Sequence, residues 1–227
     1  MYKLIAFDAY GTLLDVYSMG VLADELFPGQ GQALCLLWRD RQIEYTRLVT
    51  MSDPGGSRNY HSFWDLTIAA LRYSCKRMGL DLQPNHEQQL MGQYAKLSAF
   101  PECAAVINQI KQKGIATAVL SNGNVAMLSS ALATNQLDCL LDRVISVDEV
   151  RQFKISPATY ALLPAHFAVR PSETLFISSN AWDIIGAAWF GLDTYWVNRQ
   201  ALPFEEIGPK PTYTGRNLND LLAVLPT

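Results

Sequence analysis

The sequence predicts an α/β fold built on a doubly wound parallel sheet. Short apolar runs typical of buried strands recur along the chain, at Leu4–Phe7, Ile115–Leu120, Val144–Val147, Leu175–Ile177 and Tyr195–Val197. Helical patterns separate most of these runs, as at Cys103–Lys113 and Ala158–His166. Regular alternation of strand and helix is typical of a Rossmann-like sheet, so we expect that architecture for the core of the protein.

The interval after the first strand predicts an inserted helical cap. Residues 8–114 separate the first two apolar runs, far more than one crossover helix needs, and from about Tyr17 to Leu97 the pattern is almost wholly helical. One helix face is marked by Trp64, Ile68, Leu71, Cys75 and Met78, and another by Leu34, Trp38, Tyr45 and Leu48. We expect an α/β core domain over residues 1–15 and 98–227 and a cap domain over residues 16–97.

Composition excludes several classes of partner. The 227 residues are 49% hydrophobic with a mean hydropathy of +0.05, which is enough for a sizeable core. The net charge is −3 and the sequence contains no basic stripe, so we expect no nucleic-acid partner. No apolar run approaches the ~20 residues of a membrane span, and the first residues do not resemble a signal peptide. We therefore expect no membrane partner.

Cysteine and histidine usage argues against disulfides, zinc and a hydrolytic triad. The cysteines, Cys35, Cys75, Cys103 and Cys139, form no CxxC pair and are typical of free thiols in a reducing compartment, so we expect a cytoplasmic protein. The histidines, His61, His86 and His166, are scattered and form no HExxH motif, and GxSxG is absent. We expect neither a metal nor another cofactor.

Polar residues follow several of the predicted strands at the same relative place. Asp8 ends the first strand, Ser121 and Asn122 follow the second, and Asp148 and then Lys154 follow the third. The fourth leads into Ser178, Ser179, Asn180, Trp182 and Asp183. Each alone has an ordinary explanation, such as a turn residue, a surface lysine or a core tryptophan. Together they predict an active site, because ligands of such sheets bind outside the carboxyl ends of the strands.

These motifs resemble the haloacid dehalogenase superfamily, specifically its L-2-haloacid dehalogenase branch. The matching segments in the predicted core are FDAYGTLLD, LSNGN, KISPATY and SSNAWD, and those in the predicted cap are WRDRQIEYT and SFWDLTIAALRYSC. The resemblance covers nearly the whole chain. Members of the branch often have proline directly after the lysine, whereas Ile155 follows Lys154 here.

Phosphatases of the same superfamily are the main alternative. They carry a second aspartate two residues after the first and further acids for Mg²⁺ in the last motif, but this chain has Tyr10 and, near its last motif, Asp183. An alkoxide leaving group needs a proton donor and a phosphate dianion needs a metal, whereas a halide leaves unaided. The other open alternatives are a phosphonatase and a non-catalytic binding protein for small carboxylates.

The resemblance implies metal-independent conversion of (S)-2-haloacids to (R)-2-hydroxyacids in two steps. Asp8 attacks C2 and displaces halide to form an ester, and water then attacks the carbonyl of that ester. We expect Lys154 to be the counter-charge of Asp8 and Thr12 to hydrogen-bond its carboxylate. Asp183 is the expected base for the water. Positioning roles are expected for Ser178, Asn180 and Tyr160.

The expected partners are a small halogenated carboxylic acid, the halide ion and a second copy of the chain in a homodimer. Ser121, Asn122 and the backbone amide of Ala9 are expected to bind the substrate carboxylate. By resemblance, Arg39 of the cap and Asn122 form the halide cradle. The aromatic side chains of Tyr10, Phe63 and Trp182 are expected to form an apolar wall that excludes water.

Overall fold

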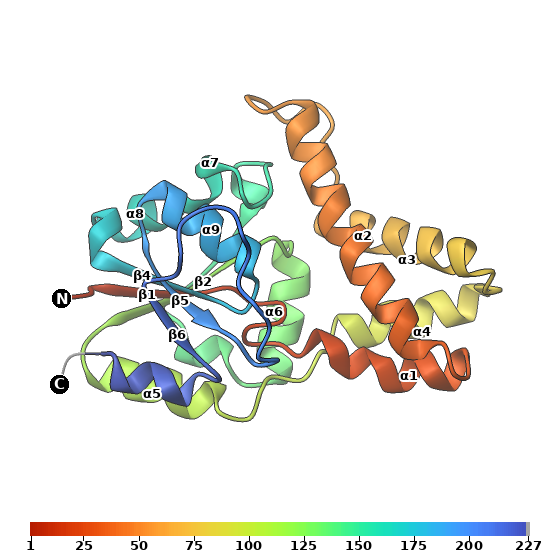
Figure 1. The fold of residues 1–227 in the computed structure, drawn as a ribbon, viewed down its shortest axis with the longest axis horizontal. Helices are drawn as coiled ribbons and strands as arrows, with labels where there is room; N and C mark the ends of the chain where they lie inside the picture. The colour runs from red at the N-terminus through yellow and green to blue at the C-terminus, as the bar shows by residue number, and fades with distance from the viewer. Residues whose placement is uncertain (226–227) are drawn as a thin grey trace.

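A parallel sheet forms the centre of the molecule in the computed structural model, which describes residues 1–225 (Figure 1). Within that range its strands run in the order β3-β2-β1-β4-β5-β6. Their bounds are β1 Leu4–Phe7, β2 Ala116–Ser121, β3 Arg143–Ser146, β4 Thr174–Ser178, β5 Asp193–Val197 and β6 Tyr213–Gly215. All neighbouring pairs are parallel, and β1 pairs through Leu4 with Ala116 on one side and Thr174 on the other. The predicted α/β fold class is confirmed.

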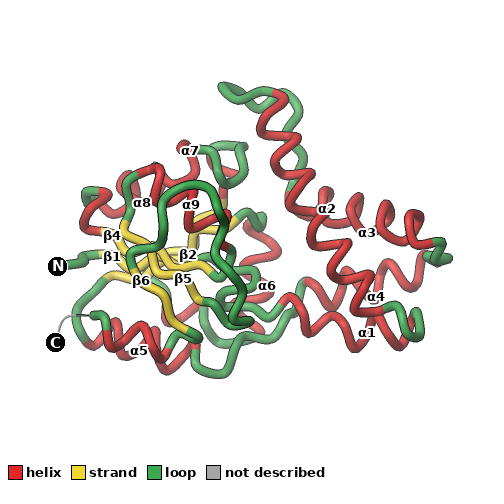
Figure 2. The backbone as a smooth tube through the Cα atoms, in the orientation of Figure 1, coloured by secondary structure: helices red, strands yellow, loops and turns green. Residues whose placement is uncertain are grey.

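Helices cover both faces of the sheet, as the red segments around the yellow strands show in Figure 2. They are α5 (Cys103–Gln112), α6 (Val125–Thr134), α7 (Pro157–Tyr160), α8 (Leu162–Phe167) and α9 (Ala181–Phe190). Short 3₁₀ turns complete the connections at Asp138–Leu140, Val147–Glu149, Pro171–Glu173 and Asn219–Ala223. The central strand is buried along its whole length, which explains its continuous apolar run.

Two details of the core differ from the sequence-based expectation. The helix expected over Ala158–His166 is divided into α7 and α8 at Ala161. Pro164 lacks the N–H that a continuous helix would donate to the carbonyl of Tyr160, so the division follows from covalent structure. The strand β6 was not predicted, because its residues, Tyr213–Gly215, form no apolar run and lie at the edge of the sheet.

Between β1 and α5 the chain forms a helical cap, on the right of Figure 1. It contains the turn Val16–Ser18 and the helices α1 (Met19–Leu26), α2 (Gly31–Ser52), α3 (Phe63–Met78) and α4 (Pro84–Tyr94). The long helix α2 packs along α3. At the start of α3, the Ser62 hydroxyl accepts a hydrogen bond from the Asp65 amide at 3.2 Å, which caps the helix directly before Phe63.

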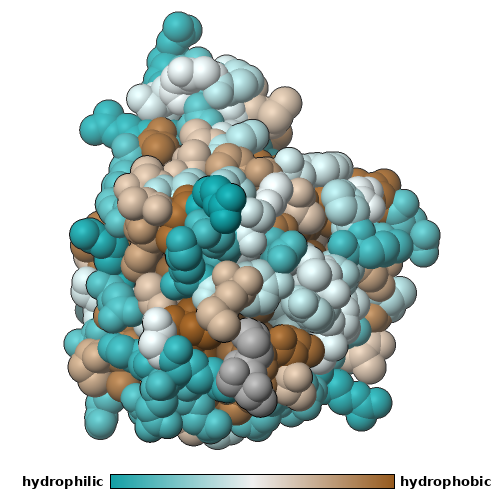
Figure 3. Space-filling model, turned by 90° about the vertical axis from the view of Figure 1, so that its left-hand side faces the viewer, coloured by the Kyte–Doolittle hydropathy of each residue, from teal (hydrophilic) through white to brown (hydrophobic). Residues whose placement is uncertain are grey.

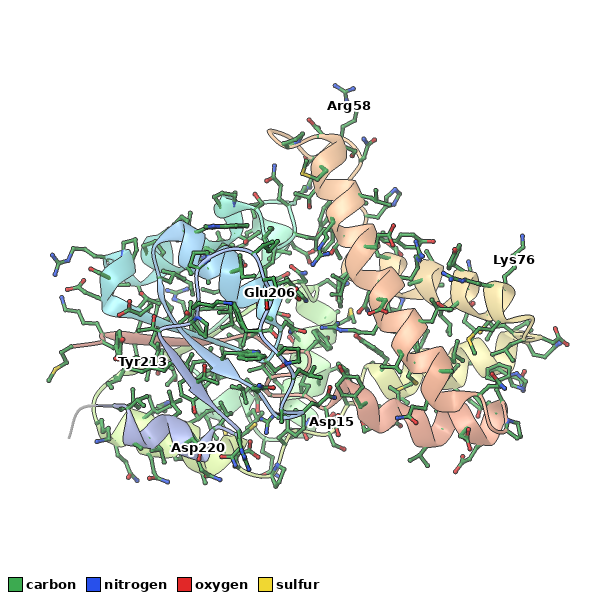
Figure 4. The ribbon with its side chains drawn as sticks, in the orientation of Figure 1. Asp15, Arg58, Lys76, Glu206, Tyr213 and Asp220 are labelled. Carbon is green, nitrogen blue, oxygen red and sulfur yellow. The ribbon has the colours of Figure 1, made fainter. Side chains whose placement is uncertain are left out.

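Backbone hydrogen bonds join the two segments through which the chain enters and leaves the cap. The Asp15 amide donates to the Ser98 carbonyl at 2.8 Å, and the Phe100 amide donates to the Leu13 carbonyl at 2.9 Å. Figure 4 labels Asp15 at this junction. The Arg199 guanidinium lies 3.6 Å from the centroid of the Phe100 ring and donates to the Thr12 carbonyl at 3.1 Å. The segment after β5 therefore supports the junction from the core side.

The face of the core turned away from the cap mixes hydrophilic and apolar side chains (Figure 3). No helix within residues 1–225 is both long and apolar enough to cross a membrane.

Candidate active site

The loop after β1 places Asp8 at the carboxyl edge of the sheet, where Asp8 is only 5% exposed. Gly11 in this loop has a φ of +91°, which L side chains rarely adopt, and a Cβ there would lie 3.1 Å from Ser179 Oγ. Glycine therefore lets the loop turn back against the segment after β4. This turn brings Thr12 beside the carboxylate that ends the strand.

Both oxygens of the Asp8 carboxylate accept hydrogen bonds. Its Oδ2 accepts from Thr12 Oγ1 at 3.0 Å, from Asn180 Nδ2 at 2.9 Å and from Ser178 Oγ at 3.4 Å. Its Oδ1 accepts from Lys154 Nζ at 3.0 Å. The donors come from the loop after β1, the end of β4 and the segment after β3, so the fold fixes the plane of the carboxylate.

The Lys154 ammonium, whose side chain is fully buried, lies between two carboxylates. It donates to Asp183 Oδ2 at 2.8 Å as well as to Asp8. Burial lowers the pKa of Lys154, but Asp183 and Asp8 outweigh that effect and raise the pKa overall. The amine is therefore a stable cation. The peptide bond from Lys154 to Ile155 is cis.

Asp183, one of the two carboxylates beside Lys154, has a raised pKa. Burial raises its pKa to about 6 although Lys154 lowers it, and the nearby negative charge of Asp8 adds to the rise. The pKa values of Lys154 and Asp183 are both raised, which favours the charged form of Lys154 but the neutral form of Asp183. Burial is the largest cause of the raised Asp183 pKa, and Lys154, whose charge is shared with Asp8, offsets it only in part. The Tyr160 hydroxyl donates to Asp183 Oδ1 at 2.7 Å and fixes its orientation.

Arg39 extends from α2 of the cap to the core. Its Nη2 donates to the Tyr10 carbonyl at 3.3 Å and to Asn180 Oδ1 at 3.4 Å. Its Nη1 donates to Gln42 Oε1 at 2.8 Å, one helical turn further along α2. Gln42 is itself held by Thr67 Oγ1, which its Nε2 contacts at 2.6 Å. A chain of polar contacts through α2 and α3 therefore orients the guanidinium.

An aromatic cluster lies beside Asp8. The Tyr10 ring is centred 5.6 Å from the rings of both Phe63 and Tyr94. The Tyr10 hydroxyl is buried and has no hydrogen-bond partner among residues 1–225. A Cβ at Gly123 would lie 2.7 Å from Tyr10 Cε2, so the ring requires glycine at that position. Trp182 is half-buried, with the Arg47 guanidinium of α2 5.7 Å from its ring centroid.

The loop after β2 contributes Ser121 and Asn122, both buried. Ser121 Oγ accepts from the Gly123 amide at 3.1 Å, and Asn122 Oδ1 accepts from the Lys154 amide at 2.9 Å. With its oxygen engaged by the lysine segment, the Asn122 side chain offers its N–H groups to an anion.

Of the predicted polar residues, Thr12, Lys154, Ser178 and Asn180 contact Asp8 directly, and Asp183 and Asn122 contact Lys154. Asp148 does not reach Asp8 and instead accepts a hydrogen bond from Tyr60 of the cap. Gln42 was not predicted as a site residue, although it stands in the WRDRQIEYT segment, and Ser179 was predicted at the strand end without a role. The Ser179 amide donates to Thr12 Oγ1 at 2.8 Å. Ala9 is buried, and its carbonyl accepts from the Leu13 and Leu14 amides.

A cavity of about 1270 Å³ lies between the cap helices α1 and α2 and the segment after β5. Its lining includes Gly11, Ser179, Asn180, Leu36 and Arg199, but not Asp8, so it approaches the carboxylate from the Asn180 side. Within residues 1–225, no three His, Cys, Asp or Glu side chains gather in a way that could hold a metal ion.

Residues 2–191 match the family model of the haloacid dehalogenase-like hydrolases. The (S)-2-haloacid dehalogenase of Pseudomonas sp. strain YL is 36% identical, over 99% of this chain and 95% of the relative. The (S)-2-haloacid dehalogenase 1 of Pseudomonas sp. strain CBS-3 is 41% identical, over 89% of this chain and 87% of the relative.

Solved structures agree with these sequence matches. A crystal structure of an L-2-haloacid dehalogenase superposes with a TM-score of 0.96 at 47% identity, covering 98% of this chain and 97% of the other. The L-2-haloacid dehalogenase of Xanthobacter autotrophicus with chloropropionic acid covalently bound superposes with a TM-score of 0.89 at 31% identity, covering 99% and 98%. The chain therefore belongs to the haloacid dehalogenase-like hydrolases, within the branch of the L-2-haloacid dehalogenases.

Proposed function

We propose that the protein hydrolyses (S)-2-haloacids to (R)-2-hydroxyacids through an ester on Asp8. The observation that carries the proposal is the setting of the Asp8 carboxylate. It lies at the end of β1 beside the Lys154 cation, with Oδ2 held by Thr12, Ser178 and Asn180. Tyr10 stands two residues later, where a phosphatase would have an acid, and a halide needs no proton to leave.

In the first step the Asp8 carboxylate attacks C2 of the haloacid while the carbon–halogen bond breaks. Its hydrogen bonds fix the carboxylate before the substrate arrives, so little reorientation is needed. Arg39 and the N–H groups of Asn122 receive the halide as it departs. The substrate carboxylate is bound by Ser121, Asn122 and the Ala9 amide, and Tyr10, Phe63 and Trp182 exclude water from the reacting carbon.

In the second step water attacks the carbonyl carbon of the Asp8 ester, and Asp183 takes its proton. The bond between that carbon and the substrate oxygen then breaks, the proton passes from Asp183 to the leaving oxygen, and the (R)-2-hydroxyacid departs from the restored Asp8 carboxylate. Esterification removes the negative charge of Asp8, which is one of the causes that raise the pKa of Asp183. Asp183 is then the one carboxylate paired with the Lys154 ammonium, which holds it in its ionised form, able to accept a proton. Tyr160 keeps the orientation of Asp183 through the 2.7 Å hydrogen bond to Oδ1.

Chloride release from (S)-2-chloropropionate in the presence of EDTA tests this proposal, with wild type compared with Asp8→Asn. We expect steady release and (R)-lactate from the wild type and none from the variant, since an amide is a poor nucleophile. A wild type that releases no chloride from either enantiomer, but cleaves phosphate esters when Mg²⁺ is added, would contradict the proposal.

We also propose a homodimer and a cytoplasmic location. The cap exposes apolar side chains, including Val21, Leu48 and Met51, which a second copy could cover. The cysteines of residues 1–225 are free thiols, as expected in a reducing compartment. Light scattering should give a mass of about two chains, and a mass of about one chain would contradict the dimer.

A further inference from the structure

The segment that carries Lys154 lies against the cap loop that joins α2 to α3. In Figure 1 this loop is the orange turn at the top of the view, and Figure 4 labels Arg58 at its tip, pointing into solvent. The Tyr60 hydroxyl of this loop donates to Asp148 Oδ1. Gln152 Nε2 donates to the carbonyls of Pro54 at 2.7 Å and Gly56 at 3.3 Å. The cap loop therefore contacts both ends of the run that leads to Lys154.

Phe153, the residue directly before Lys154, is attached to the cap by both its backbone and its ring. Its amide donates to Thr50 Oγ1 at the end of α2, at 3.0 Å. Its fully buried ring stacks on Tyr60, with ring centroids 5.2 Å apart, and lies 6.3 Å from Phe63. On the core side, the Lys154 amide is held by Asn122. The backbone around Lys154 is thus fixed jointly by cap and core.

We propose that Thr50 and Tyr60 are positioning residues that make the placement of the Lys154 ammonium depend on closure of the cap. The inference rests on the proposed function and extends it, because it explains when the Asp8 site becomes complete. With the cap seated, Thr50 accepts the Phe153 amide and Tyr60 holds Asp148, and Lys154 reaches both Asp8 and Asp183. With the cap displaced, these contacts are lost together and the lysine segment is released.

Chloride release by Thr50→Val and Tyr60→Phe tests the proposal. Valine removes the acceptor of the Phe153 amide at nearly constant volume, and phenylalanine keeps the ring stack but removes the hydrogen bond to Asp148. Since one such bond corresponds to about 1–2 kcal/mol, we expect kcat to fall roughly 5- to 30-fold in each variant. Thr50→Ser, which keeps the hydroxyl that accepts the Phe153 amide, should retain the activity of the wild type. Thr134→Val, the same change at an exposed site on α6, should leave activity unchanged.

The pH profile separates positioning of Lys154 from a general loss of structure. Asp183 faces Lys154, Asp8 and Tyr160, and of these Lys154 is the cation that keeps it ionised. If Lys154 is displaced, the acidic limb of kcat should move to higher pH in Thr50→Val and Tyr60→Phe. Unchanged kcat and an unmoved limb in both variants, with an active wild type, would overturn the proposal even if thermal stability fell.

Amide hydrogen exchange gives a readout that does not depend on turnover. The amides of residues 147–156 should exchange faster in Thr50→Val than in wild type or Thr134→Val, since the Phe153 amide loses its acceptor. Equal exchange rates in all three proteins would overturn the proposal that Thr50 holds the Lys154 segment. An inactive wild type would instead refute the proposed function, and the exchange result would still decide whether the cap holds the lysine segment.

Discussion

At the scale of single residues, the charge balance around Lys154 sets the pH dependence of ester hydrolysis. Burial raises the pKa of Asp183 to about 6 in the free protein, and the Asp8 charge contributes to that rise. The ester lacks this charge, so the acidic limb of the hydrolysis step should lie below pH 6. Below the limb Asp183 is protonated and cannot accept a proton, so the ester should accumulate. Rapid-quench measurements of the amounts of ester and product at pH values below 6 would test this pH dependence.

The control is Asp183→Asn, which should form the ester and hydrolyse it slowly at every pH. Hydrolysis by the wild type that stays constant well below pH 4 would contradict the role of Asp183 as base, because its ordinary pKa is about 3.9.

Tyr10 carries a buried hydroxyl that finds no partner within residues 1–225. Burial raises its pKa well above the ordinary value, so it stays neutral. Removing an unsatisfied buried hydroxyl should help folding, and we expect Tyr10→Phe to gain up to about 1 kcal/mol and keep its halide release. Tyr94→Phe is the matched contrast, since the Tyr94 hydroxyl bonds to Gln42 and its loss should lower the unfolding temperature. A large loss of activity in Tyr10→Phe would instead indicate that the Tyr10 hydroxyl hydrogen-bonds the substrate.

At the scale of elements, α2 brings Arg39 to the site and Gln42 orients it. In Gln42→Leu the guanidinium loses an acceptor, and Thr67 and Tyr94 lose a partner. Hydrogen bonds to charged groups contribute about 1.5–3 kcal/mol, so kcat/KM should fall roughly 10- to 100-fold. Gln89→Leu, on an exposed face of α4, should be neutral. Equal kcat/KM in Gln42→Leu and wild type would show that Arg39 needs no such support.

Elements with a long buried run could be predicted from the sequence, and others could not. The strand β1 lies where its apolar run places it, and β2 and β4 differ by a residue at their ends. The edge strand β6 has no such run. In the site, polar residues at strand ends were predictable because parallel strands end at one edge. The link from Gln42 to Thr67 depends on how α2 packs on α3, which local pattern does not specify.

At the scale of the whole molecule, the site is complete only when cap and core lie together. Asp8, Lys154 and Asn180 belong to the core segments, whereas Arg39 and Phe63 come from α2 and α3. A substrate that contacts both parts should bind the closed arrangement and not the unfolded chain. Binding of an unreacted substrate should therefore stabilise the entire molecule.

Asp8→Asn with (S)-2-chloropropionate provides that measurement, because the variant should bind the substrate without consuming it. At about 100 times Kd the ligand should add about 2.7 kcal/mol, which for a chain of this length raises the unfolding temperature by roughly 5–10 °C. The same addition to Asp8→Asn combined with Arg39→Ala should give a much smaller rise, because the cap cation assigned to the halogen is then lost. A rise equal in both proteins would mean that the core alone binds the substrate and that the cap serves only to cover it.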